Sequence, residues 1–189
     1  MNSSFRIALT TALWALLVSG APAAPAEIIF LRHAEKPPSG PELNTQGWKR
    51  AKALAGLFTQ DGRVQEHGRP AAIFAAGLVK PGGSVRSIQT MIATGKALNL
   101  PVDSHITRDN ITGLVQAIMD SPAYEGKTVL VCWEHKKIPG MVAAFGWDEA
   151  PKKWNDSVYD RLWILNFEHG RPVRFRDLPE KLLPGDSAQ

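Results

Sequence analysis

The sequence predicts an α/β domain: a three-layer sandwich with a mainly parallel central sheet, helices on both faces and an antiparallel hairpin at its C-terminal edge. Two observations predict this fold. Short apolar runs rich in Ile and Val, typical of strands buried on both faces, alternate with segments of helical periodicity. The last part of the chain instead has two adjoining strand-like segments joined through a glycine.

The first predicted strand is the apolar segment 27–31, and a loop rich in Pro and Gly follows it. The segment from Thr45 to Phe58 has the period of an amphipathic helix, with Trp48 on the face that we expect to be buried. Thr45 is the expected N-cap of this helix, because its hydroxyl can accept a hydrogen bond from the first turn.

The second strand and two further helices occupy the middle of the chain. The segment 71–76 predicts a buried strand, and a helical pattern runs from Ser84 until Pro101 stops it. Residues 102–107 indicate a short edge strand. The segment 111–119 has apolar residues at i, i+3, i+4, i+7 and i+8, the clearest amphipathic helix of the sequence.

The C-terminal part completes the sheet. Residues 127–133 form the third predicted buried strand, and Pro139 suits the first turn of the helix that follows. Segments 160–167 and 171–178 read as a hairpin with a three-residue link, 168–170. The ligand sites of such sheets lie at the carboxyl ends of the parallel strands.

The N-terminal segment 1–26 predicts a secretory signal peptide. Arg6 is its single charge, an apolar run follows at 7–18, and small residues then allow cleavage after Ala23 or Ala26. The apolar run is shorter than a membrane-spanning helix, so an uncleaved anchor is the less favoured alternative. We therefore expect an exported protein, periplasmic or secreted, whose remaining residues form one domain with no membrane span.

Charge and cysteine content narrow the range of functions that the sequence allows. The formal net charge is +4, and the Lys and Arg residues are scattered, which argues against nucleic acid and suits a small anionic substrate. A single cysteine, Cys132, lies within an apolar run, so no internal disulfide is possible. We interpret this cysteine as a structural core residue rather than a nucleophile.

Polar residues follow each of the three buried strands. Arg32 and His33 follow the first strand, Arg86 lies within the first turn of the helix after the second, and Glu134 and His135 follow the third. Guanidinium groups bind phosphate oxygens, a neutral imidazole can form a covalent intermediate, and a second imidazole can donate to a phosphoryl oxygen. Together these residues predict phosphoryl transfer through histidine, with no metal and no cofactor.

Four segments also carry a resemblance to a known family. They are "LRHAEKP" (31–37), "LNTQGWKRAKALAGLF" (43–58), "SVRSIQT" (84–90) and "TVLVCWEH" (128–135). In this order they resemble the motifs of the histidine phosphatase superfamily, which includes the phosphoglycerate mutases. The resemblance covers residues 27 to about 145. It implies that His33 is the nucleophile and that Arg32, Arg86 and His135 bind the phosphoryl group.

The sequence departs from the motifs of this family at the positions that would supply the proton donor for the leaving group. Family members usually have Gly before the second histidine, whereas this chain has Glu134, and the stretch 101–124 contains no counterpart of the glutamate that donates a proton in the mutases. Glu134 is a candidate general acid. The alternative is a structural role, such as pairing with Lys136 or Lys137.

Three functions follow. The leading one is a phosphomonoester hydrolase acting on a small phosphorylated substrate or a phosphorylated cell-envelope component. The second is a module of the same fold that binds phosphorylated ligands with little turnover. The third, ranked last, is a zinc site of His33, Glu35 and His135. Trp147 and Trp154 either line the pocket mouth or, as we favour, cover the edge of the core.

Overall fold

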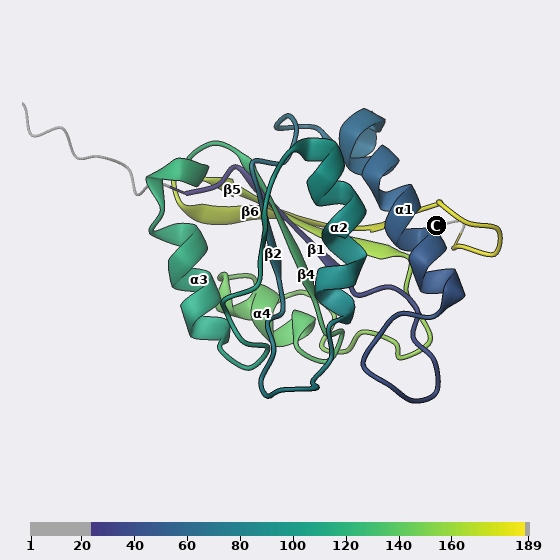
Figure 1. Ribbon diagram of the computed structural model, residues 1–189. Coiled ribbons are helices and arrows are strands. Elements are labelled where there is room, and N and C mark those ends of the chain that lie inside the picture. The colour runs from purple at the N-terminus through teal and green to yellow at the C-terminus, as the bar shows by residue number, and fades with distance from the viewer. Residues whose placement is uncertain (1–23, 188–189) are drawn as a thin grey trace, which may run out of the picture.

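The computed structural model describes residues 24–187 and has a six-stranded sheet with helices on both faces (Figure 1). The strands lie in the order β3-β2-β4-β1-β5-β6. The strands are β1 (Glu27–Arg32), β2 (Ala72–Ala75), β3 (Val102–Asp103), β4 (Thr128–Trp133), β5 (Arg161–Glu168) and β6 (Arg171–Pro179). The helices are α1 (Thr45–Gln60), α2 (Arg86–Leu98), α3 (Ile111–Met119) and α4 (Ile138–Ala144), with short 3₁₀ turns η1 (Gly62–Val64) and η2 (Pro122–Tyr124).

The sheet is parallel from β3 to β1 and antiparallel beyond it. Strand β1 pairs in parallel with β4, β4 with β2 and β2 with β3, whereas β5 runs antiparallel to β1 and β6 antiparallel to β5. Parallel neighbours need a crossover connection, and here the helices supply it. The fold class predicted from the sequence is confirmed.

Two apolar layers separate the sheet from its helices. Alternate residues of each strand point to opposite faces, so that in β1 Ile28 and Phe30 pack toward α3 and α4, whereas Ile29 and Leu31 pack toward α1 and α2. Figure 1 shows these two helix pairs on opposite sides of the strands. Burial on both faces explains why the central strands are apolar without alternation.

Three local expectations were wrong. The N-cap of α1 is Asn44, not Thr45, because the Asn44 side chain accepts the hydrogen bond from the Gly47 N–H. Trp48 is 42% exposed rather than buried, because the face of α1 that packs on the core is the one with Ala51 and Leu54. The hairpin link between β5 and β6 has two residues, not three; His169 and Gly170 both take positive φ, as a tight hairpin turn requires.

The expected signal peptide lies almost wholly outside the described residues; of segment 1–26, only residues 24–26 fall within them. These three residues pack on the domain, where Ala26 donates to the Lys127 carbonyl and accepts from the Phe167 N–H. Among residues 24–187, no helix combines the length and the apolar character that crossing a membrane would need.

Candidate active site

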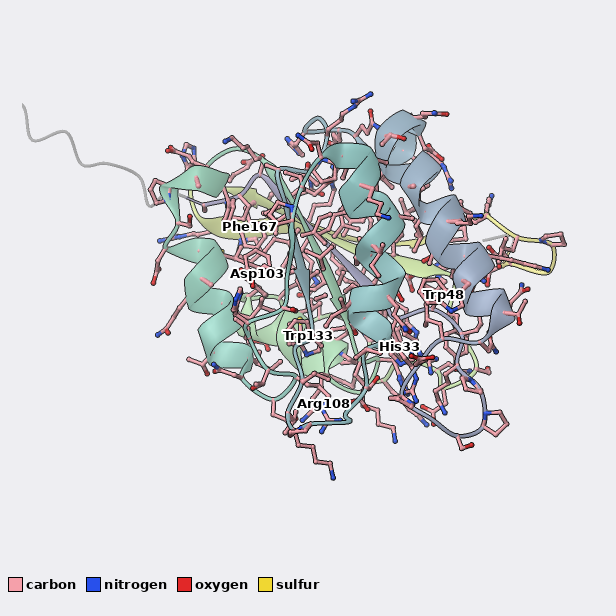
Figure 2. All side chains as sticks on the ribbon, viewed as in Figure 1. His33, Trp48, Asp103, Arg108, Trp133 and Phe167 are labelled. Carbon is pink, nitrogen blue, oxygen red and sulfur yellow. The ribbon has the colours of Figure 1, made fainter. Side chains whose placement is uncertain are left out.

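A cavity of about 490 Å³ opens at the carboxyl ends of the parallel strands. Figure 2 shows His33, Trp133 and Arg108 together at this end, whereas Phe167 of the antiparallel β5 lies toward the other. The charged and hydroxylated residues that line the cavity are His33, Lys36, Lys80, Ser84, Arg86, Ser87, Arg108, Glu134, His135 and Lys136. Five of them are Lys or Arg and one is acidic, so the cavity favours an anion.

The His33 side chain is buried where β1 ends, and its backbone N–H donates to the Trp133 carbonyl at the end of β4, 3.0 Å away. Its Nδ1 lies 2.7 Å from the Ala34 carbonyl oxygen. A carbonyl only accepts hydrogen bonds, so Nδ1 carries the proton and Nε2 holds the lone pair. Nε2 is therefore the nucleophilic atom of this ring.

Electrostatics keep the His33 ring neutral. Burial lowers the pKa of His33 to about 4, and the charges of Arg32, Arg86 and His135 contribute in the same direction, although the hydrogen bond with Ala34 opposes them. Above this pH the ring is uncharged and its lone pair is free to attack. The first histidine thus has the protonation state that nucleophilic catalysis needs.

The loop after β1 is fixed from both neighbouring helices. Thr90 of α2, fully buried, accepts the Ala34 N–H through its hydroxyl at 2.9 Å. The Glu35 carbonyl accepts the Asn44 N–H, and a Cβ at Gly47 would collide with that carbonyl oxygen. The Gly and Thr positions of the second and third sequence motifs therefore hold the loop that carries His33.

Arg32 does more than the sequence suggested. One terminal nitrogen of its guanidinium donates to the carbonyls of Asp156 at 2.7 Å and Val158 at 2.8 Å. The guanidinium carbon stacks 3.7 Å from the centre of the Tyr159 ring. Arg32 does not line the cavity wall, so its predicted contact with the phosphoryl group stays a prediction, whereas its role in holding the 155–159 loop is plain.

Helix α2 begins at Arg86 rather than at the predicted Ser84, so Arg86 lies in its first turn as expected, and it lines the cavity. Its Nε donates to the Glu42 carbonyl at 3.2 Å, and a terminal nitrogen donates to the Gly40 carbonyl. Arg86 therefore connects the cavity to the Pro- and Gly-rich loop that follows β1. Its predicted phosphate contact also stays a prediction.

Glu134 lies on the cavity wall beside His135. Strand β4 ends at Trp133, so the alternation of the strand no longer directs the Glu134 side chain away from the site. Its carboxylate lies 3.3 Å from the Nε of Arg108 rather than beside Lys136 or Lys137. The expected pairing with a following lysine was wrong because the loop after β3 brings Arg108 across the strand end.

His135 has a partner that the sequence reasoning missed. Its Nε2 lies 2.9 Å from an Asp156 carboxylate oxygen, while its Nδ1 is buried without a hydrogen-bond partner among residues 24–187. Asp156 belongs to a loop between α4 and β5 that carries no recognisable motif. The sequence feature that could have indicated Asp156 is the polar run between Trp154 and β5.

Glu35 does not belong to a metal site with the two histidines. Its carboxylate binds Arg50, and the ligand atoms of His33, Glu35 and His135 do not gather within the described residues. The zinc hypothesis is therefore wrong. Glu27, Glu66 and His67 do bring ligand atoms together, at the other end of β1, but Arg176 forms ion pairs with both carboxylates.

Two further expectations concern buried residues. Trp154 packs within the core and Trp147 against it, and neither lines the cavity, so the favoured core-edge interpretation agrees with the structure. Cys132 is fully buried in β4, and burial raises the pKa of its thiol. A thiol in this environment stays protonated, which agrees with a structural role.

The fold is similar to that of two solved structures, a candidate phosphohistidine phosphatase and a phosphoglycerate mutase. A candidate phosphohistidine phosphatase named SixA, from Agrobacterium tumefaciens, superposes with a TM-score of 0.52 at 18% identity, covering 80% of this chain and 98% of its own. Phosphoglycerate mutase from Plasmodium falciparum gives a TM-score of 0.51 at 16% identity, covering 86% of this chain and 96% of its own. No protein-family profile and no curated protein sequence matches the chain. The chain has the phosphoglycerate mutase-like fold that its motifs resemble.

Proposed function

We propose that this protein is a phosphomonoester hydrolase that works through a phosphohistidine intermediate on His33. The observation that carries the proposal is the state of that ring: it is buried and neutral, and its Nδ1–H is bound to the Ala34 carbonyl. Its nucleophilic Nε2 is thereby available to a ligand in the cavity, which is lined by cations. The likeness in fold to SixA and to a phosphoglycerate mutase supports the same chemistry.

The reaction has two steps. Nε2 of His33 attacks phosphorus, the bond between phosphorus and the ester oxygen breaks, and the leaving alcohol takes up a proton. Water then attacks the phosphohistidine, which releases inorganic phosphate and restores the neutral ring. Arg86 and His135 stabilise the charge on the phosphoryl oxygens, a task that needs no metal ion.

The test is hydrolysis of p-nitrophenyl phosphate by His33→Ala. We expect activity to fall at least about a thousandfold, because removal of a nucleophile leaves only binding effects. His105→Ala is the matched control, since the side chain of His105 is exposed and lies outside the cavity. Wild-type protein should keep full activity in EDTA and form an acid-labile phosphoenzyme. Undiminished turnover by His33→Ala contradicts the proposal.

A second candidate is a module that binds phosphorylated ligands with little turnover. It is favoured by the engagement of Glu134 with Arg108, which leaves the carboxylate predicted as general acid already paired. An enzyme without an acid cleaves aryl phosphates far faster than alkyl phosphates, because only a basic alkoxide needs a proton. Measurable phosphate binding with no turnover of either ester would select the binding module.

We propose that the substrate is a small phosphorylated molecule or a phosphorylated component of the cell envelope. The signal-like segment 1–26 supports export to the periplasm or the medium. The cations around the cavity support an anionic ligand. Fractionation of cells that produce the full chain would locate the protein, and its recovery in the cytosol with residues 1–23 retained would contradict export.

A further inference from the structure

A carboxylate from a distant loop holds the second histidine. The Oδ1 of Asp156 lies 2.9 Å from Nε2 of His135, although 21 residues separate them along the chain. The His135 side chain is 8% exposed, whereas that of Asp156 is 67% exposed. The carboxylate thus reaches from the surface to the edge of the cavity and binds one nitrogen of a nearly buried ring.

The backbone of this loop is tied down at several points. Arg32 donates to the carbonyls of Asp156 and Val158, and the indole N–H of Trp154 donates to the same Val158 carbonyl at 2.9 Å. The residue that anchors the loop therefore directly precedes His33. Because the loop is fixed to the end of β1, the contact between Asp156 and His135 belongs to the architecture of the site.

We propose that His135 is the proton donor to the leaving group and that Asp156 is its positioning residue. The inference rests on the proposed function and assigns the acid that the sequence motifs lack. Asp156 accepts the Nε2–H of the ring, so Nδ1 is the nitrogen of this cavity-lining residue that is left to donate to a ligand. Nδ1 is buried and has no hydrogen-bond partner among the described residues, so an oxygen of a bound ester supplies the acceptor that this atom lacks.

The proton balance of both steps follows. As the P–O bond breaks and the bond from phosphorus to Nε2 of His33 forms, the proton on Nδ1 of His135 passes to the ester oxygen. His135 is then neutral and keeps its Nε2–H on Asp156. When water attacks the phosphohistidine, Nδ1 takes the proton of that water, so that the imidazolium is restored and inorganic phosphate leaves.

The charges around His135 define a pH window. Burial and then Arg32 lower the pKa of His135, whereas the hydrogen bond and charge of Asp156, and the charge of Glu134, raise it. The charged and titratable groups near this ring are Arg32, His33, Arg86, Arg108, Glu134, Lys136 and Asp156. Because the pKa of His33 falls to about 4, a neutral nucleophile and a protonated donor coexist between about pH 4 and the pKa of His135, which lies below its usual 6.5.

The experiment compares an aryl ester, p-nitrophenyl phosphate, with an alkyl ester, β-glycerophosphate. In Asp156→Ala we expect kcat for the alkyl ester to fall on the order of a hundredfold and kcat for the aryl ester to change little. In Asp156→Asn the hydrogen-bond acceptor remains and the charge is lost, so the alkaline limb of the pH profile should move to lower pH with a smaller loss at the optimum. Ser157→Ala, a change in the same loop, is the control and should match wild type.

Equal losses on the two esters, or alkyl turnover by Asp156→Ala equal to that of wild type, would overturn the assignment. So would a wild-type protein that cleaves the aryl ester and not the alkyl one. In each of these cases the phosphohistidine on His33 and aryl turnover still stand, and so does the proposed function. A wild-type protein that forms no phosphoenzyme and cleaves neither ester refutes the proposed function instead. The exposed Asp156 side chain makes both variants compatible with folding, which circular dichroism verifies.

Discussion

Replacing Arg50 with methionine should destabilise the protein by about 3–5 kcal/mol, the cost of removing one partner from a buried ion pair. The Arg50 side chain is 4% exposed and lies in α1. Its nitrogens donate to Glu35 at 2.8 Å, to Glu180 at 2.8 Å and to Asp186 at 2.7 Å. Each nitrogen of the guanidinium is used, so methionine would replace its volume but none of its hydrogen bonds.

The size of the predicted stability loss follows from the carboxylates that would remain without a partner. Glu180 is fully buried, and burial raises the pKa of its carboxyl, whereas Arg50 lowers it. Without the guanidinium, Glu180 must take up a proton or leave the interior. Asp186 also accepts the N–H groups of Leu182 and Leu183, so the end of the chain would lose its attachment to α1.

The assay is urea denaturation at pH 7, followed by circular dichroism. For a domain of this size, 3–5 kcal/mol corresponds to a fall in Tm of roughly 6–20 °C. Arg174→Met is the matched control: Arg174 pairs with Glu66 on the surface, and we expect a much smaller loss because solvent screens that pair. Arg50→Met combined with Glu180→Leu should recover part of the loss. A single variant within about 1 kcal/mol of wild type would refute the reasoning.

Two further predictions concern pH and the N-terminus. Because the pKa of His33 is about 4 in the folded protein and about 6.5 when unfolded, the unfolded state binds the extra proton first, and stability falls as pH drops from about 6.5 to 4 by roughly 3 kcal/mol. His33→Gln should lose less stability than wild type between pH 7 and pH 4 in urea titrations; equal losses would contradict the assignment. A chain that begins at Ala24 should be more stable than one that begins at Glu27 by about 1–3 kcal/mol, since Ala24 and Ala26 accept the N–H groups of Gly126 and Phe167. Urea denaturation of the two chains measures this difference, and equal stability would contradict it.

The fold followed from periodicity because the central strands are buried on both faces. The apolar runs 28–31 of β1 and 129–133 of β4 leave few alternatives to a parallel sheet covered by helices. The first difference between prediction and structure is at the N-terminus of α1, where Asn44 rather than Thr45 caps the helix. Asn and Thr are both good N-caps. Which of them caps α1 depends on where the preceding loop contacts Glu35, and local sequence does not determine such a tertiary contact.

The site was predictable where strand ends supply the residues. His33, Arg86, Glu134 and His135 all line one cavity because parallel strands present their carboxyl ends together. Asp156 was not predictable in this way. It comes from a loop that precedes an antiparallel strand, and its path depends on Arg32, whose guanidinium the sequence assigned to the ligand.

Arg32 therefore connects the two histidines through the backbone. It directly precedes His33 in the chain, and through the carbonyl of Asp156 it fixes the residue that binds His135. A lysine at this position would keep the charge, but it lacks the planar guanidinium that stacks on Tyr159 while one of its nitrogens donates to both carbonyls. The arginine after the first strand thus adjoins the proposed nucleophile in the chain and, through the 155–159 loop, holds the partner of the proposed acid, which accounts for a guanidinium next to an imidazole at this strand end.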